Sequence, residues 1–553
     1  MTGVAVEATA ALGSSRTAKF DPPTSSSFTG TRRLLWLVLR RDRFRIAMWM
    51  LGLVGLMAVS ASSVTALYKT PEQLAGYART VRGNSALIIQ AGPGYGLDQP
   101  TVAAVVMNET ALWMFVAVAV MNVFMVVRHT RTEEESGRAE LVRAAPVGRH
   151  AALASAMVGA LIVTAVAALG NVIALEVLGL PVGGSAAFGA SMIGIGAVFG
   201  GVAAVAAQVA SGTRAALAAG GAAVGVAFIL RAIGDVGNGV LSWASPIGWA
   251  QGIRAYADER WWVLLLPVAT TLGLVVAARA LQDHRDFGSG LVAQRAGRAE
   301  ARASLSTALG LAVRLQRGAL VGWAVGLGLL SFFYGLVADQ AEKIIDENPD
   351  MADFFAELGM ASVTDAFLST AMLIMALFAS GFTVSSVLRL RSEELAGRAD
   401  PVLATPVSRR QWAAGHLGIA LVGTAVLMLV CGLAMGAAAA LVLGDAGRLG
   451  ELSAAGLVMV PAMWVLAGAT FLLFGWRPRW SLAAWAFVAW AFVAEMLGTV
   501  LDLPQWLLDL SPFQHVPALP AAPMAWLPLI LLTVIAAIAV AAGLSAFDHR
   551  DVT

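Results

Sequence analysis

Long apolar stretches with few or no charges recur along the whole chain and leave few folds open to it. Hydrophobic residues make up 58% of the 553 residues and charged residues only 13%, against about 25% charged in ordinary soluble domains. Several stretches reach the roughly 20 residues that a helix needs to cross a bilayer. Strand signals are absent from the sequence, which therefore predicts an all-α polytopic membrane protein.

The apolar stretches fall into two sets of six, which predict about twelve transmembrane helices. The first set lies near residues 45–67, 109–128, 150–177, 186–211, 214–233 and 261–281. The second set lies near residues 318–338, 364–388, 411–443, 451–475, 480–500 and 524–547. We therefore expect two fused six-helix halves, related as parallel repeats about an axis along the membrane normal.

Composition divides the chain into four parts. Residues 1–30 are rich in Ser, Thr and Ala without an apolar core, which predicts a disordered cytoplasmic tail rather than a signal peptide. Residues 31–286 and 304–553 are the two six-helix transmembrane halves. Residues 287–303 are an arginine-containing cytoplasmic linker.

The distribution of charge predicts the orientation in the membrane. Arginines precede the first, fifth and eleventh expected spans and fill the linker, whereas residues 339–357 carry seven carboxylates and a single lysine, Lys343. Both termini of this multi-pass protein are therefore expected in the cytoplasm.

One charged segment occurs twice. Residues 131–149 read RTEEESGRAELVRAAPVGR, and residues 391–409 read RSEELAGRADPVLATPVSR. Each copy lies between two apolar stretches, so each predicts a cytoplasmic hairpin. The simplest alternative is a solvated loop whose arginines follow the charge rule, but that rule does not require paired glutamates, Gly-Arg-Ala and a proline at fixed spacing. We interpret the two segments as docking surfaces for a soluble partner.

Short-range spacing within the segment predicts a stiff helix. Thr132 and Glu135 have the spacing of a capping box in the first copy only. In both copies a glutamate precedes an arginine by four residues, which places the two on one helix face: Glu134 and Arg138, and Glu394 and Arg398.

Further matches run along the two halves. Arg40, Arg43 and Trp49 match Arg314, Arg317 and Trp323 in stretches that predict amphipathic helices at the interface. Both halves end in Asp-His-Arg-Asp, at residues 283–286 and 548–551. Two carboxylates and one histidine in four consecutive residues converge poorly on one ion, so we interpret this motif as a polar stop and expect no metal site.

The paired loops of the form E-E-x-x-G-R-A-[E/D]-x-V-x-A-x-P-V-x-R, with the lead-in helices and the six-plus-six layout, resemble permeases of ABC-2-type exporters. More narrowly, they resemble the actinobacterial "exporter of polyketide antibiotics" permeases, which are linked to multidrug efflux. The resemblance implies a location in a bacterial plasma membrane. In such permeases this loop is the coupling helix that enters a groove on the ATPase. The resemblance assigns ATPase docking to ten residues: Glu133, Glu134, Gly137, Arg138, Glu140, Glu393, Glu394, Gly397, Arg398 and Asp400.

The energy source is expected on another polypeptide. A P-loop needs a lysine after a glycine-rich turn, and none of the three lysines, Lys19, Lys69 and Lys343, has that context. We therefore expect no cofactor and no catalytic residue on this chain, which is a transport subunit and not an enzyme. Two docking loops imply two copies of an ATP-binding cassette ATPase subunit, which would bind ATP and Mg.

Methionine and aromatic side chains in the second and eighth spans suggest a path for bulky apolar compounds, since such side chains form adaptable walls. The alternative for each of them is ordinary packing between helices or against lipid. The candidate path residues are Trp113, Phe115, Met121, Phe124, Phe367, Met372, Met375 and Phe378.

Two intramembrane charges occupy matching places in the fifth and eleventh spans. Arg231 and Glu495 each follow a phenylalanine by three residues. A lone charge in the membrane is costly and usually faces a partner or water, so we predict that the two pair across the halves as an outer gate. Independent snorkelling to the interface is the alternative.

The sequence thus predicts the permease subunit of an ATP-driven exporter of bulky hydrophobic compounds such as antibiotics. Two alternatives stay open. One is an ATP-driven exporter or flippase of a lipid or cell-wall precursor, and the other is an ion-coupled secondary transporter. Nothing in the sequence suggests nucleic acid as a partner.

Overall fold

The computed structural model describes residues 26–82, 85–286, 288–292, 299–300, 303–338, 362–498 and 503–550. The chain divides into two compact units, Met1–Ala296 and Gly297–Thr553, called half one and half two below. Their boundary falls within the stretch predicted as a linker. Most of the predicted tail, residues 1–25, and the acidic connection 339–357 lie outside the described residues.

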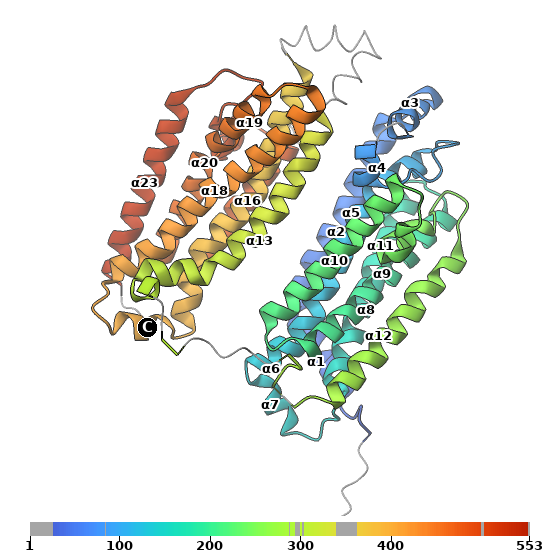
Figure 1. The fold of residues 1–553 in the computed structure, drawn as a ribbon, viewed down its shortest axis with the longest axis horizontal. Coiled ribbons are helices and arrows are strands. Elements are labelled where there is room, and N and C mark those ends of the chain that lie inside the picture. The colour runs from blue at the N-terminus through green and yellow to red at the C-terminus, as the bar shows by residue number, and fades with distance from the viewer. Residues whose placement is uncertain are drawn as a thin grey trace, which may run out of the picture. The chain divides into compact units, whose positions relative to one another are not determined.

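Half one is a bundle of helices in which all regular structure of the described residues is helical (Figure 1). A lead-in helix and two short helices accompany it: α1 (Thr31–Arg41), α3 (Pro71–Arg82) and α4 (Ser85–Ala91). The long helices are α2 (Arg43–Leu67), α5 (Val102–Val127), α8 (Ala151–Val177), α9 (Val182–Val209), α10 (Thr213–Val236) and α12 (Leu265–Asp283), with the short α11 (Pro246–Gly252) between the last two.

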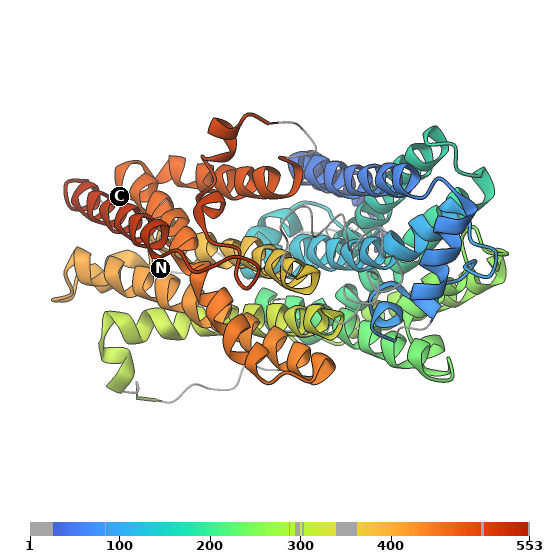
Figure 2. The ribbon, with the colours of Figure 1, turned by 90° about the horizontal axis from the view of Figure 1, so that it is seen from above.

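Half two repeats this order within its described ranges. Its helices are α13 (Ala308–Leu336), α16 (Val363–Leu395), α18 (Arg409–Leu443), α19 (Gly447–Val458), α20 (Val460–Trp476), α21 (Ala484–Leu497), α22 (Gln505–Leu508) and α23 (Trp526–Asp548). Within each half the long helices run alongside one another in both views (Figures 1 and 2).

Eleven helices among the described residues are long and apolar enough to cross a membrane, which confirms the polytopic all-α class. The expected number of about twelve is not confirmed within the described residues. The stretch predicted near 480–500 begins with a 3₁₀ turn, Pro478–Ala483, and continues as α21, which has 14 residues. Proline fixes the backbone at the start of this segment, and residues 499–502 lie outside the described part.

Helices α5 and α16 are the most enclosed of their halves, with 72% of their most apolar windows buried. Close approach by α9 contributes to this burial in half one. A Cβ added at Gly196 would lie 2.8 Å from the Cγ2 methyl of Thr164 and 2.9 Å from Nδ2 of Asn122. Small residues permit such close contacts between membrane helices, so Gly196 is required where α9 crosses its neighbours.

A buried polar bridge shows how the halves correspond. In half one Asn122 Nδ2 donates to Thr164 Oγ1 over 2.9 Å, and in half two the hydroxyls of Thr383 and Thr424 lie 2.8 Å apart. Thr164 and Thr424 differ by 260 positions, as the two loops do, whereas Asn122 and Thr383 differ by 261. The extra residue of half one lies in a π-helical turn, Arg128–Thr132, at the end of α5.

Candidate functional site

In each repeated loop a glycine bends the chain between two helical segments, so the loop is not one stiff helix. In half one α6 (Glu133–Glu135) and α7 (Arg138–Arg143) meet at Gly137, whose φ is 73°. In half two α16 is followed by Gly397, with φ 64°, and by α17 (Ala399–Leu403). Glycine adopts this left-handed conformation without steric cost, so it sets the bend.

The bend overturns the predicted ion pairs within the loop. Glu134 and Arg138, like Glu394 and Arg398, are no longer on one face, because the glycine between them interrupts the helical period. Instead Arg138 Nη1 lies 3.7 Å from Glu133 Oε1, and in half two Arg398 Nε donates to Glu393 Oε2 over 2.8 Å. This hydrogen bond raises the pKa of Arg398 above its ordinary value.

The predicted capping box is also wrong. Thr132 has helical backbone angles and its side chain caps nothing, because the π-helical turn continues the chain from α5 without a helix N-terminus. Glu135 Oε2 instead accepts the backbone N–H of Thr213, the first residue of α10, over 2.7 Å. The third glutamate of the loop thereby connects it to the fifth long helix.

The second glutamate of each loop binds the arginine of the Asp-His-Arg-Asp end of its own half. Arg285 Nη2 and Nη1 donate to Glu134 Oε1 and Oε2 over 2.5 and 2.9 Å, and Arg131 adds a further bond of 2.9 Å. In half two Arg550 Nη2 donates to Glu394 Oε2 over 2.9 Å. The two sequence motifs that repeat most clearly are therefore in contact in both halves.

The first arginine of each loop reaches the connection between the fourth and fifth spans. Arg131 donates to the carbonyl oxygen of Ser211 over 2.5 Å, and it also bonds to those of Gly288 and Ser289. Arg391 Nε donates to the carbonyl oxygen of Pro478 over 2.9 Å. We name the repeated set the loop clamp, which comprises Arg131, Glu134 and Arg285 in half one, and Arg391, Glu394 and Arg550 in half two.

The first aspartate of each terminal motif completes the attachment. Asp283 lies 3.3 Å from Arg149 and 3.4 Å from His150, and Asp548 accepts from Arg410 Nε over 2.5 Å. His150 and Arg410 occupy the same position in the two copies, 260 residues apart. The terminal motif thus fastens the last helix of each half to both ends of the loop, which its interpretation as a polar stop missed.

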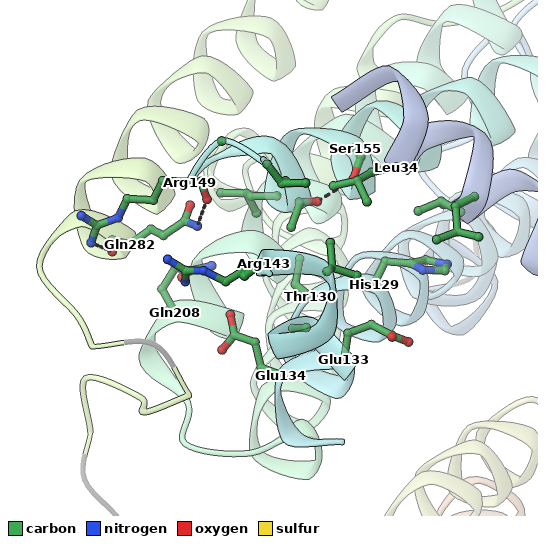
Figure 3. A pocket seen from close by; sticks show the side chains of 18 of the residues that line it. Leu34, His129, Thr130, Glu133, Glu134, Arg143, Arg149, Ser155, Gln208 and Gln282 are labelled. Carbon is green, nitrogen blue, oxygen red and sulfur yellow. Dashed lines mark hydrogen bonds between the residues drawn. The ribbon is translucent and has the colours of Figure 1, made fainter. Parts of the chain in front are cut away.

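A cavity of about 350 Å³ lies beside the loop of half one. Residues of α1, the loop and the adjoining ends of α8, α9 and α12 line it, and Figure 3 shows Glu133, Glu134 and His129 among them. Arg41 of α1 donates to Glu133 over 2.8 Å, which links the lead-in helix to the loop.

The ten predicted docking residues separate into two groups. The four glutamates, Glu133, Glu134, Glu393 and Glu394, have side chains only 17%, 11%, 6% and 5% exposed and bind arginines of their own half. Arg138 and Arg398 are 58% and 54% exposed. Glu140, Asp400 and Gly397 are also exposed, and Gly137 is partly so.

Each loop also exposes a leucine that the sequence analysis did not select. Leu141 in α7 is 78% exposed, and Leu395 at the end of α16 is 67% exposed. The leucines occupy different positions in the two copies, since Leu141 aligns with Pro401 and Leu395 with Glu135. An apolar residue that is not matched in the other copy of a charged repeat was the signal in the sequence that could have identified these leucines.

The residues predicted to line a transport path do not form one group. Phe115, Met121, Met372 and Met375 are core residues, and the ring centroid of Phe115 lies 5.6 Å from that of Phe188. Phe367 is partly buried and packs 6.2 Å from Tyr334. Trp113, Phe124 and Phe378 have exposed side chains.

Trp113 and Phe124 are the exposed ends of one stripe of α5, and the residues between them are partly buried. They are 11 residues apart, which is about three turns of a helix, and Ala117 and Val120 lie between them on the same face. At an offset of 261 the corresponding positions of α16 are 374, 378, 381 and 385. Phe378 therefore lies on the matching stripe of half two.

Arg231 and Glu495 each have partners within their own half. Arg231 donates to the carbonyl oxygens of Ile88 and Ile89 over 3.1 and 2.8 Å and to Asp235 over 3.2 Å. Glu495 accepts from Ser511 over 2.7 Å and from Gln514 over 2.9 Å. The outer-gate argument assumed that each charge has no partner nearby, and both charges do have partners. Asp235, four residues after Arg231, was visible in the sequence, and pairing across the halves stays a prediction.

Two helical repeats, each with a charged loop between long apolar helices, define a polytopic α-helical membrane protein built as a duplication. A family model described as "Multidrug efflux system permease Rv1217c, C-terminal domain" matches residues 305–548. Over 542 residues, 96% of this chain and 97% of the relative, the sequence is 41% identical to the multidrug efflux system permease protein Rv1217c of Mycobacterium tuberculosis. The chain belongs to this family of multidrug efflux permeases, which confirms the predicted resemblance to exporter permeases.

Proposed function

We propose that the chain is the membrane-spanning subunit of an ATP-driven exporter of bulky hydrophobic compounds. Two copies of an ATP-binding cassette subunit, which bind ATP and Mg, dock on the two loops. The observation that carries the proposal is the repeated loop itself, which in each half exposes the arginine of its Gly-Arg-Ala segment while its second glutamate holds it to the end of the last helix of that half. The printed name of the Mycobacterium tuberculosis relative supports drug efflux.

The loop clamp explains how docking moves the membrane helices. Arg131 and Arg391 bind the connection before the fifth span, and Glu134 and Glu394 bind the end of the last helix. A displacement of either loop by its ATPase therefore acts on three helices of that half together. Buried charge-assisted hydrogen bonds are short and directional, so the ends move as one body while one half rocks against the other.

The loops, both termini and the linker lie on the cytoplasmic side in this proposal. The stripes of α5 and α16 that carry the exposed Trp113, Phe124 and Phe378 form apolar walls along the path. Apolar walls suit compounds without a fixed pattern of hydrogen bonds, because aromatic and aliphatic side chains can contact molecules of different shapes.

The test reverses the exposed arginine of both loops. Arg138→Glu combined with Arg398→Glu leaves both glycine bends and both glutamate–arginine clamps in place, but it puts like charge in a docking groove. We expect loss of ATPase co-purification and of drug-stimulated ATP hydrolysis, with milder effects for each single reversal. Arg32→Glu with Arg33→Glu, two exposed positions on α1, is the matched control.

Unchanged co-purification and efflux in the double reversal would remove the docking assignment. The ion-coupled alternative predicts a different result in a second measurement. If the proton gradient is dissipated while ATP is maintained, efflux should continue in the proposed exporter, and its loss would favour a secondary transporter.

A further inference from the structure

A second cavity of half one, distinct from the one beside the loop, lies between α2, α5 and α10. Its volume is about 430 Å³, within the roughly 300–1,000 Å³ typical of small-molecule sites. Its lining residues are Asp42, Arg45, Ile46, Trp49, Met121, Phe124, Met125, Arg128, Thr132, Val163, Thr213 and Leu217. All of them belong to half one.

The lining is apolar along the helices and charged where the helices meet the loop. Trp49, Phe124 and Met125 are among the walls, and Phe124 is 51% exposed despite lying on the most enclosed helix of the half. Methionine and aromatic walls accept ligands of varied shape. Asp42, Arg128 and two threonine hydroxyls mark the polar end.

The polar end carries more positive than negative charge. Asp42 Oδ1 accepts from Arg128 Nε over 3.1 Å and lies 3.5 Å from Arg45 Nη1, while Oδ2 lies 2.6 Å from His129 Nε2. One carboxylate therefore serves two guanidinium groups, and Arg45 is 55% exposed. Glu135 accepts the Thr213 amide and is not among the lining residues.

Half two shows that the fold does not require this arrangement. Gln316 takes the place of Asp42 and bonds to Ser386 and, over 3.1 Å, to His416. Alanine at 319 takes the place of Arg45, and serine at 385 that of Phe124. Arg389, the counterpart of Arg128, is bound to Glu393 over 2.7 Å. Neutral hydrogen bonds hold the same joint in half two, so the additional charge and the aromatic wall of half one need another explanation.

We propose that this cavity binds an amphipathic molecule with an acidic group. The carboxylate or phosphate lies between Arg45 and Arg128, where the guanidinium groups donate charge-assisted hydrogen bonds that are stronger than neutral ones. The apolar body of the ligand lies against Trp49 and Phe124. A role of the cavity in loading cargo for export depends on the proposed function. Binding of an acidic amphipathic molecule depends only on the residues that line the cavity. The ligand is either a small acidic amphiphile or the headgroup end of an anionic phospholipid.

The test is photolabelling of the full chain in nanodiscs of phosphatidylcholine. Three probes with the same diazirine-bearing alkyl chain are compared: a fatty acid, the corresponding alcohol and a phosphatidic acid. Mass spectrometry then locates the labelled peptides. We expect saturable labelling near Trp49 and residues 121–125 by an acidic probe, with the alcohol weaker by about tenfold because it cannot form the charged hydrogen bonds.

Arg45→Ala, which installs the residue of half two, should lower acidic labelling at this cavity by about tenfold, and Phe124→Ser should lower it for all probes. Arg43→Ala, an exposed arginine of α2 outside the lining, is the matched control. Arg45→Gln replaces Arg45→Ala if the latter unfolds at a lower temperature.

Labelling by the fatty acid assigns the site to small acidic amphiphiles, and labelling by phosphatidic acid alone assigns it to phospholipid; both support the proposal. Equal labelling by acid and alcohol, or acidic labelling unchanged in Arg45→Ala and Arg45→Gln, overturns it. Labelling that persists when ATP is added to a complex with intact ATPase coupling removes the loading role, while the proposed function stands because co-purification tests it independently.

Discussion

The two halves hold their loops with the same three side chains, but they build the joint between the lead-in segment and the first span differently. Arg131, Glu134 and Arg285 in half one have counterparts of the same residue type in half two, and the counterparts make corresponding contacts. At the joint, however, half one places a charged cluster around Asp42 and half two a neutral network around Gln316. Attachment of the loop therefore tolerates little variation, whereas the cavity above the joint is free to specialise in one copy.

The clamps also differ in how strongly each is held. Glu134 receives three hydrogen bonds from two arginines. Glu394 receives one from Arg550, whose guanidinium also lies 5.0 Å from the ring centroid of Phe474 and 5.3 Å from that of Phe547. Cation–π contacts of this kind contribute about 0.5–2 kcal/mol. The half-two arginine thus keeps other favourable contacts when its carboxylate is removed.

The largest expected effect separates the two clamps. Glu134→Ala leaves Arg131 and Arg285 buried without their carboxylate and should lower the free energy of unfolding by about 3–5 kcal/mol. Glu394→Ala should cost less, because Arg550 retains its aromatic contacts. Thermal unfolding of the purified variants measures the difference, with the exposed Glu140→Ala as control. Equal losses in both halves would show that the additional hydrogen bonds of half one contribute nothing.

A charge swap tests whether Arg231 and Glu495 depend on each other or on their own halves. Arg231→Glu places a new carboxylate beside Asp235. Removal of one partner of a buried ion pair lowers the free energy of unfolding by about 3–5 kcal/mol. The local partners predict that Arg231→Glu combined with Glu495→Arg is no better in efflux than the worse single variant. Recovery of efflux in the double variant would establish the predicted outer gate between the halves.

Replacing the charged joint of half one by the residue of half two should have an intermediate effect. Asp42→Gln takes away the carboxylate that binds Arg128 and His129, and loss of hydrogen bonds to a charged group costs about 1.5–3 kcal/mol. The exposed Arg40→Gln on α1 should change stability by less than about 0.5 kcal/mol. Denaturation monitored by tryptophan fluorescence compares the two, and a tolerated Asp42→Gln would show that the joints are interchangeable.

The smallest expected effect concerns the exposed leucines, which differ in position between the loops. Leu141→Ser and Leu395→Ser should each weaken ATPase binding by about tenfold, because burying a leucine side chain in a docking groove removes its apolar surface from water. Val177→Ser, at an exposed position at the opposite end of α8, is the control for loss of surface hydrophobicity. Binding to the separately purified ATPase gives the affinities, and an effect from only one leucine would mean that the two grooves are not equivalent.

Hydrophobicity predicted where most of the long helices lie, but it did not always predict the residue at which a helix ends. Helix α8 was expected at 150–177 and spans Ala151–Val177. Helix α16 was expected to end at 388 and continues to Leu395, because the Arg389–Glu393 pair stabilises a further helical turn. Hydropathy reports burial in lipid and gives no signal for helical turns made of paired charges.

The position of the candidate site was predictable, but its internal partners were not. The repeat identified the loops and the terminal motifs separately. The partners Glu134 and Arg285 are 151 residues apart, beyond any rule of helical spacing. The i,i+4 rule failed for Glu134 and Arg138 because Gly137 breaks the helix. The occurrence of both motifs in both halves, with a glutamate in one and an arginine in the other, was the signal that would have joined them.

The π-helical turn Arg128–Thr132 gives half one a spare residue at the junction of α5 and the loop. If that turn rewinds to an α-helix, the surplus residue must pass into a neighbouring segment, which rotates one side relative to the other by about 100° and shifts it by about 1.5 Å. Half two has no extra residue at the matching place, where α16 is a continuous α-helix from Val363 to Leu395. If two ATPase subunits dock as proposed, the same displacement of both loops therefore acts on a π-helical junction in half one and on a continuous α-helix in half two, so we expect the two halves to move by different amounts.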